Sequence, residues 1–488
     1  MSLRQSAILG VKWESFSKAT VIGIEFLRLA VLTRMLSPAD FGLKTMIMVA
    51  IGFAQSFEDL GISNAVIYRQ DVTHHHLSSI YWLNLIAGIA LFIFVWAATP
   101  LLVLLFNEPR LAVLLPWEAL VFIITPLGRQ FQTLMQKELQ FDRLAKVELA
   151  SAIVSAVVAI FLARFGCGVF SLIWGEISLA ASKAVLSAWL SWNIWRPELH
   201  FQRSDLQGYL SFGIYQMGER GMDYLSVNAD YLVVGRFLGS KILGTYMLAY
   251  RLVALPIAKI NPIVTSVAFP VFARKQSDNA TLRRGYLEMI KLLALTVFPI
   301  LIGLGIAAPL VVPLFFGAGW AAAIPLVQIM VLLGILKTMM NPSISILWAK
   351  GRTDIGFLWY ASVALINVMV FWSVVQYQGA YGVAWSQVIL YIAYFIFFGS
   401  VVLRFVIGLT WSEYLLAIAW PAIMSMIMGG IVLAAYVFLA RLPIDKPCFL
   451  LGLTITGAIA YGPAVIMLER KFLLEIWSLI IKKKQVTA

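Results

Sequence analysis

VLTRMLSPADFGL, residues 31 to 43, returns further along the chain as VVGRFLGSKILGT, residues 233 to 245. At one constant offset of 202 positions, Arg34 matches Arg236, Leu36 matches Leu238 and Gly42 matches Gly244. In a membrane chain such a repeat indicates duplication into two halves, and transporters built from repeats bind their substrates where the halves meet. The repeat therefore favours a transporter over an enzyme.

The composition agrees with a membrane location. The 488 residues are 61% hydrophobic and only 12% charged, which does not suit a soluble domain. A helix needs roughly 20 apolar residues to cross the hydrocarbon core, and stretches of that length recur along the whole chain. We expect an all-α polytopic protein with about 14 spans. They lie near 10–33, 41–66, 77–106, 111–135, 146–166, 168–194, 208–235, 242–272, 286–316, 320–347, 355–377, 380–405, 412–440 and 447–468.

A second repeat defines how the halves are related. GVFSLIWGEI (168–177) is similar to GAYGVAWSQV (379–388). The two repeats pair the first six spans with the next six. Because six crossings return the chain to the side of the membrane where it started, the two halves have the same orientation. We predict an N-terminal lobe over residues 1–200, a second lobe over 201–408, and two further helices with a basic tail over 409–488.

The basic residues indicate the orientation. Lys and Arg concentrate in the alternating loops that share a side with both termini, for example at Arg283, Arg284 and the run Lys482 to Lys484. Cytoplasmic loops carry this bias, so both termini are predicted to face the cytoplasm. Basic loops beside anionic lipid also account for the net charge of +13, and no nucleic-acid partner is predicted.

The first span carries a charged stripe. Glu14, Lys18, Glu25 and Arg28 are spaced 4, 7 and 3 residues apart, which confines them to an arc of about 80° on a helix. An ionisable group at bilayer depth costs roughly 2.5 to 3.5 kcal/mol, so its surroundings must offset that cost.

The seventh span carries an acidic counterpart. Glu219, Asp223 and Asp230 repeat the 4 and 7 spacing, with Gln216 and Ser226 on the same face. Such charges can be structural ion pairs, or they can border a water-filled pathway. The two stripes together favour the pathway.

Other charges fall inside predicted spans. The cations are Lys183, Arg220, Arg251, Lys259 and Lys337, and the acids are Glu58, Asp59, Glu118 and Glu176. Arg251 and Lys259 lie eight residues apart, close to one helix face, and such cations can hold a phosphate or pyrophosphate. Lys183, Glu118 and Glu176 are interpreted as residues that snorkel near an interface, without a functional role.

Signals for catalysis or metal binding are weak. Cys167 and Cys448 are far apart and have no motif neighbours, so neither a disulfide nor a metal site is expected. The run His74 to His76 is interpreted as a solvated turn, and His200 as a lone residue of another loop. The sequence has no Walker loop, HExxH or nucleophile elbow, and no catalytic residue is predicted.

Several stretches carry a family resemblance. They are RLAVLTRMLSPADFGL (28–43), FEDLGISNAVIYRQ (57–70), LMQKELQFDRLAKVE (134–148), NADYLVVGRFLG (228–239) and GTYMLAYRL (244–252). With them the chain resembles a polysaccharide-transport flippase of the multidrug, oligosaccharidyl-lipid and polysaccharide exporter superfamily, close to the Wzx-type exporters of colanic acid and similar exopolysaccharides.

The resemblance implies two six-helix lobes around a central cavity, two trailing helices, and alternating access by rocking of the lobes. The expected cargo is an oligosaccharide on undecaprenyl pyrophosphate, moved from the cytoplasmic to the periplasmic leaflet of a bacterial inner membrane. The products it would serve are exopolysaccharide, capsule or O-antigen. Membrane lipids, a polysaccharide polymerase and chain-length machinery are the other implied partners.

The resemblance also suggests roles for individual residues. Arg28, Arg251 and Lys259, with Lys18, would receive the pyrophosphate. A Na⁺ or H⁺ gradient would drive transport, with no other cofactor. The coupling candidates are Asp230, which best matches an acidic position of such relatives, Asn367 and Gln387 as neutral oxygen donors, and the stripe residues Asp223, Glu219 and Glu25. The alternative for Asp230 is an ion pair with Arg251 or Arg28.

Two rival functions are considered. A multidrug or metabolite cation antiporter of the same superfamily would need a cavity that attracts cations, and buried Arg28, Arg251 and Lys259 oppose it. Buried acids slightly outnumber buried cations, so this alternative stays open. A polysaccharide ligase or polymerase would carry a large periplasmic loop, whereas every predicted outer loop here is short.

Overall fold

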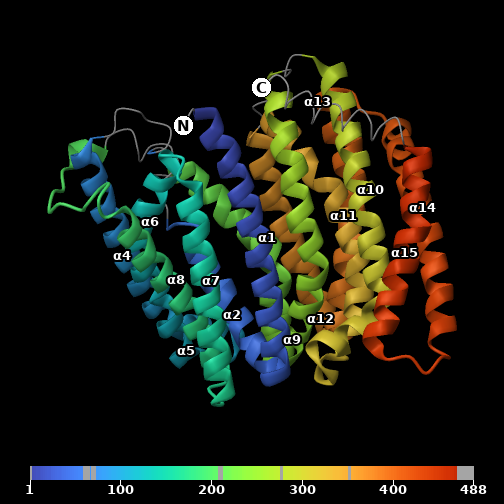
Figure 1. The fold of residues 1–488 in the computed structure, drawn as a ribbon, viewed down its shortest axis with the longest axis horizontal. Coiled ribbons are helices and arrows are strands. Elements are labelled where there is room, and N and C mark those ends of the chain that lie inside the picture. Colours follow the sequence, from blue (N-terminus) through green and yellow to red (C-terminus); the bar gives the residue numbers. More distant parts are fainter. Residues whose placement is uncertain are drawn as a thin grey trace. The chain divides into compact units, whose positions relative to one another are not determined.

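The computed structural model describes residues 3–58, 66, 73–206, 213–274, 278–349 and 353–469. Nearly all secondary structure in these ranges is helical (Figure 1). Ten helices within them are long and apolar enough to cross a membrane. The predicted fold class, an all-α polytopic membrane protein, is therefore confirmed. The chain divides into two compact units, Met1–Gly244 and Thr245–Ala488.

The first unit is a helical bundle. Its helices are α1 (Leu3–Met35), α2 (Pro38–Gln55), α4 (His74–Phe106), α5 (Leu111–Ala119), α6 (Val121–Lys137), α7 (Phe141–Arg164) and α8 (Val169–Ser191), followed by the short η1 (Arg203–Leu206) and the first part of α9 (Gly213–Arg274). Helix α7 lies beside α1 and α8, and α6 also packs on α8 (Figure 1). Helix α5 contacts α2, α4 and α8.

The second unit contains the rest of α9 and the remaining helices. They are α10 (Asn279–Val311), η2 (Val312–Phe316), η3 (Ala318–Trp320), α11 (Ala323–Ala349), α12 (Thr353–Phe397), η4 (Phe398–Leu403), α13 (Arg404–Ile407), α14 (Trp411–Leu439) and α15 (Lys446–Leu468). Helix α10 packs on α11, α14 and α15, so the two C-terminal helices attach to this unit through α10.

Each predicted span coincides with a helix or with part of one. Helices α9 and α12 each contain two helices that meet at a glycine, Gly239 (φ 77°) and Gly379 (φ 60°). The predicted end of the second span at residue 66 is wrong, because α2 ends at Gln55 and a turn follows it. Helices α1 and α2 are not among the ten apolar candidates.

The start of α2 follows from the letters SPAD. Ser37 accepts a hydrogen bond from the Asp40 backbone N–H at 3.3 Å, and the Asp40 carboxylate accepts one from the Ser37 N–H at 2.9 Å. This reciprocal capping box satisfies two backbone donors, and Pro38 fits the first turn because that position needs no donor. The chain can therefore reverse sharply between α1 and α2.

The second repeat has a structural basis in its glycines. Gly168, which precedes α8, has φ 55° and ψ −134°, and Gly379, its predicted match, has φ 60° and ψ −150°. Only glycine adopts such a conformation readily. The two residues that the repeat aligns therefore make the same turn.

The first repeat has a basis in close packing. A Cβ atom on Gly42 would overlap the carbonyl oxygen of Ser240, and a Cβ atom on Gly244 would overlap that of Pro38. Pro38 and Ser240 are themselves 202 residues apart, the offset that relates Gly42 to Gly244. The two copies of the repeated turn thus pack on each other reciprocally, each glycine against the other copy's backbone.

Candidate functional site

Arg28, the predicted pyrophosphate ligand of the first span, connects three helices of the first unit. Its Nη2 donates to Glu176 Oε1 on α8 at 2.9 Å, and its Nη1 donates to Ser155 Oγ on α7. Ser155 in turn donates to the carbonyl oxygen of Gly175 at 2.7 Å. The Arg28 side chain is 18% exposed and that of Glu176 is 32% exposed. The positive charge of the Arg28 guanidinium is therefore balanced by Glu176, and the group is still partly exposed.

A second ion pair lies in the same unit. Lys44 Nζ on α2 is 2.7 Å from Glu118 Oε1 on α5, and the side chain of Glu118 is only 6% exposed. Glu118 therefore does not snorkel toward an interface, and that interpretation is wrong. Glu176 likewise forms an ion pair with Arg28 instead. A buried acid such as Glu118 needs a charged partner, and the helix packing supplies Lys44 to it.

The other predicted residues of the first unit differ in exposure. Asp230 on α9 is 1% exposed, and its Oδ1 accepts the backbone N–H of Tyr231 at 2.9 Å. Asp223 is half-buried, whereas Lys18 and Glu25 on α1 are exposed. Asp59 and the side chains of Glu14, Gln216, Glu219 and Arg220 lie outside the described residues.

The repeat relates the two predicted groups of ligands. At the offset of 202, Arg28 corresponds to Asp230. At the offset that aligns Gly168 with Gly379, Glu176 corresponds to Gln387. One half thus carries a cation and an acid where the other carries an acid and a neutral amide. The predicted anion ligand and the predicted cation ligand occupy equivalent positions.

The predicted residues of the second unit form two groups. Arg251 and Lys259 are both exposed on α9. Asn367 and Gln387 are each 4% exposed and lie in α12 on either side of its glycine turn. The Asn367 side-chain oxygen accepts a hydrogen bond from the Tyr394 hydroxyl at 2.9 Å. The structure therefore places the two cations at exposed positions and the two amide side chains, which could offer oxygen ligands, at buried ones.

Lys337, on α11, is surrounded by aromatic rings. Its ammonium group lies 4.7 Å from the Tyr250 ring centroid and 5.0 Å from that of Tyr391, and it donates to the Tyr250 hydroxyl at 2.8 Å. Cation–π attraction stabilises a half-buried ammonium in such a position. Three helices, α9, α11 and α12, contribute to this group.

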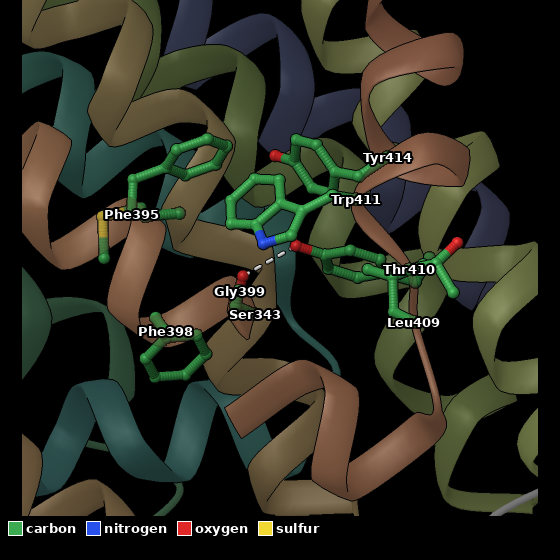
Figure 2. Close-up of a pocket in the computed structure, with 10 residues that line it drawn as sticks. Ser343, Phe395, Phe398, Gly399, Leu409, Thr410, Trp411 and Tyr414 are labelled. Carbon is green, nitrogen blue, oxygen red and sulfur yellow. Dashed lines mark hydrogen bonds between the residues drawn. The ribbon is translucent and has the colours of Figure 1, made fainter. Parts of the chain in front are cut away.

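A small aromatic pocket opens where α10, α11, α12 and α14 approach one another in the second unit (Figure 2). Phe395, Phe398, Trp411 and Tyr414 surround it, and the Tyr286 and Ser343 hydroxyls share a hydrogen bond of 2.7 Å within it. None of the predicted ligands lines this pocket. The dense aromatic packing indicates a joint that attaches α14 to the unit rather than a binding site.

Comparison with known proteins places the chain in a family. The model of the family described as "Polysaccharide biosynthesis protein" matches residues 31–325. The chain is 34% identical to the teichuronic acid biosynthesis protein TuaB of Bacillus subtilis (strain 168), over 79% of this chain and 80% of that protein. It is also 34% identical to the lipopolysaccharide biosynthesis protein WzxC of Escherichia coli (strain K12), over 78% of each chain. The chain belongs to the polysaccharide biosynthesis protein family.

The fold agrees with this membership. The structure of the lipid II flippase MurJ in its inward closed conformation superimposes with a TM-score of 0.75, over 94% of this chain and 99% of that one, at 16% identity. At this identity the likeness concerns the fold alone. The predicted membership of an exporter family is confirmed, and with it the class of a multi-pass membrane transporter rather than an enzyme.

Sequence reasoning missed a cluster on this family member that contains all four histidines of the chain. His74 and His75 at the start of α4 lie 3.5 and 3.7 Å from the carboxylate of Glu198. The rings of His75 and His200 are 4.3 Å apart, and His200 Nε2 is 3.0 Å from Asp205 Oδ2. The interpretation of His200 as a lone residue is wrong.

Asp205 attaches the connection after α8 to α4. The Ser79 hydroxyl donates to Asp205 Oδ2 at 2.7 Å, and this bond, aided by His200, holds the pKa of the Asp205 carboxyl below its usual range. No sequence signal marks this contact, because Ser79 and Asp205 are separated by 126 residues.

Proposed function

We propose that this protein moves a lipid-linked oligosaccharide across a bacterial inner membrane, from the cytoplasmic to the periplasmic leaflet. The observation that carries the proposal is the family match over residues 31–325, with relatives named for teichuronic acid and lipopolysaccharide biosynthesis. The similarity in fold to a lipid II flippase supports it. The cargo, in this proposal, is carried on undecaprenyl pyrophosphate and serves exopolysaccharide, capsule or O-antigen synthesis.

The physical task explains why buried charges are needed. A pyrophosphate headgroup with its sugars cannot cross hydrocarbon without partners, because an unpaired charge there is strongly disfavoured. The polyprenyl tail loses nothing by remaining in lipid. Lobes formed by residues 1–200 and 201–408 would alternate access to a cavity between them, and residues 409–488 would stay outside the repeat.

Arg28 is the central headgroup ligand in this proposal. A guanidinium offers paired donors that suit phosphate oxygens. Its present partner, Glu176, is 32% exposed, so an incoming pyrophosphate can replace that carboxylate without burying a bare charge. Lys18, Arg251 and Lys259, all exposed, would contact the headgroup at other stages.

A cation gradient would supply the energy, through Asp230. Its carboxyl group is 1% exposed, and hard cations prefer oxygen ligands, which Asn367 and Gln387 can also offer. Asp223, Glu219 and Glu25 would assist. If Asp230→Asn exports normally with unchanged dependence on Na⁺ and pH, Asp230 has no coupling role.

Reconstitution tests the proposal directly. Purified protein in proteoliposomes should move a fluorescent, short-chain polyprenyl-pyrophosphoryl oligosaccharide between leaflets, as read by a membrane-impermeant quencher. Arg28→Ala should slow this movement, whereas Arg28→Lys should retain part of it because the charge remains. Transport of organic cations with no lipid movement would favour the antiporter alternative.

Cells provide a second test. Deletion of the gene should make lipid-linked oligosaccharide accumulate on the cytoplasmic leaflet. Normal surface polymer in a deletion strain with no redundant exporter would overturn the proposal. Reporter fusions at residues 1 and 488 should report a cytoplasmic location for both termini, as the basic loops predict.

A further inference from the structure

Two ion pairs of the first unit, Arg28 with Glu176 and Lys44 with Glu118, lie at one depth. Arg28 is about two helical turns before the end of α1, and Lys44, Glu118 and Glu176 are each about two turns after the start of their helices. These helix ends alternate along the chain, so all four residues lie roughly 10 Å inward from the same side of the bundle. Two cations and two acids therefore share one layer.

Glu118 is the most buried member of this layer, and only one of its oxygens is satisfied. Oε1 accepts from Lys44 Nζ at 2.7 Å. Oε2 is buried and has no hydrogen-bond partner within the described part of the chain. A buried, charged carboxylate oxygen that accepts no hydrogen bond is energetically unfavourable. Binding a proton neutralises the carboxylate and so removes this cost.

The charged groups on the helices around Glu118 are few, and they favour Glu118 as the residue that binds the proton. Helix α2 contributes Lys44, and Glu176 on α8 and Arg28 on α1 are close enough to act on Glu118 electrostatically. Helix α4, which also packs on α5, carries no acidic or basic residue after His76. Helix α6 continues from α5, and its Arg129 lies 3.2 Å from Glu58.

The charges of Arg28, Lys44, Glu118 and Glu176 sum to zero when both acids are ionised. When an anionic headgroup displaces Glu176 as the partner of Arg28, these groups carry a net negative charge, and Glu176 and Glu118 repel each other as like charges. A proton from water on Glu118 Oε2 restores the balance. That proton also removes the charge partner of Lys44, whose ammonium then attracts the anion.

We propose that Glu118 is a proton-binding residue whose occupancy is linked to the binding of a phosphate-type anion at Arg28 and Lys44. The inference rests on the proposed function, because it assumes an anionic headgroup. By linkage, the proton strengthens anion binding by the same factor as the anion strengthens proton binding, typically about 5- to 150-fold. Glu118 is a different residue from Asp230, and it lies in the other copy of the repeat.

The test uses full-length protein in nanodiscs and inorganic pyrophosphate as the probe. Its affinity should rise roughly 5- to 150-fold as the pH falls from about 9 to about 5. Binding to the wild-type protein in weak buffer should take up about one proton, as read by a pH indicator. Glu118→Gln imitates the protonated state and should bind tightly with little pH dependence.

Glu58→Gln is the matched control, because Glu58 is an equally buried acid of the same unit, paired with Arg129. It should retain the wild-type pH dependence. Pyrophosphate binding by wild-type protein without proton uptake, or an unchanged pH profile in Glu118→Gln, overturns the inference. The absence of pyrophosphate binding at any pH also overturns it.

The lipid-flipping assay separates the two proposals. Flipping by wild-type protein, together with a Glu118→Gln profile that matches wild type, would leave the proposed function standing and remove the role of Glu118. Proton-linked pyrophosphate binding without flipping would support the linkage and overturn the function. The proton-uptake measurement needs no variant, so a misfolded Glu118→Gln cannot obscure the result.

Discussion

The reciprocal contact of Gly42 and Gly244 leads to a sharp prediction. An added methyl at either position would overlap a backbone carbonyl, that of Ser240 or Pro38, which cannot rotate away as a side chain can. Overpacking costs about 1 to 3 kcal/mol, and the backbone obstacle places these sites at the upper end. Alanine recovers about 1 kcal/mol of helix propensity, so Gly42→Ala and Gly244→Ala should each destabilise by about 2 kcal/mol.

The assay is thermal unfolding of purified protein in detergent, with two glycine-to-alanine variants as controls. Gly23 in α1 and Gly303 in α10 are helical glycines with open space where the methyl would lie. Their alanine variants should match or exceed wild-type stability. Gly42→Ala and Gly244→Ala in one chain should cost less than the sum of the two, because the first displacement already separates the turns. Additive losses, or losses no larger than in the controls, would refute the reciprocal contact.

Three further predictions concern single side chains. Ser155→Ala removes the hydroxyl that accepts from Arg28 and should lower the free energy of unfolding by about 1 to 3 kcal/mol, measured by chemical denaturation. Gly168→Ala forces a side chain into φ 55° and should cost about 1 to 3 kcal/mol by the same measurement, so a neutral effect would contradict the assigned turn. Asp205 has a lowered pKa in the folded state, so its contribution is fully present above about pH 4 and is lost as the pH falls through the folded value. Asp205→Asn should therefore lower the melting temperature at neutral pH and reduce its fall at acidic pH. A dependence of melting temperature on pH identical to that of the wild type would show that the contact of Asp205 with Ser79 does not contribute to stability.

Local patterns predicted the helices and their turns well. Apolar stretches gave the positions of the spans, because a membrane helix must be apolar over its whole length. The repeated letters aligned Gly168 with Gly379, and the two share one backbone conformation. The end of the second span was placed too late, since apolar residues continue beyond Gln55 after the helix has ended.

Charge partners could not be predicted in the same way. Helical periodicity placed Arg28 on one face of the first span, but its partner Glu176 is 148 residues away. Glu118 was interpreted as snorkelling near an interface, whereas α2 brings Lys44 to it. His200 was interpreted as a lone loop residue, whereas the folded connection brings it to His75 and to Asp205.

The sequence by itself determined the membrane class, the span positions, the family and the duplicated turns. These depend on hydrophobicity, on the periodicity of the chain and on the conformational freedom of glycine. Such properties can be read from neighbouring residues or from residues that a repeat aligns. Only the tertiary structure decided which cation meets which acid, that Glu118 is left with an unsatisfied oxygen, and that Gly42 and Gly244 each face the other copy's backbone. The reason is that burial and ion pairing depend on distances in space between segments far apart in sequence, 74 residues for Lys44 and Glu118 and 148 for Arg28 and Glu176, and helix packing sets those distances.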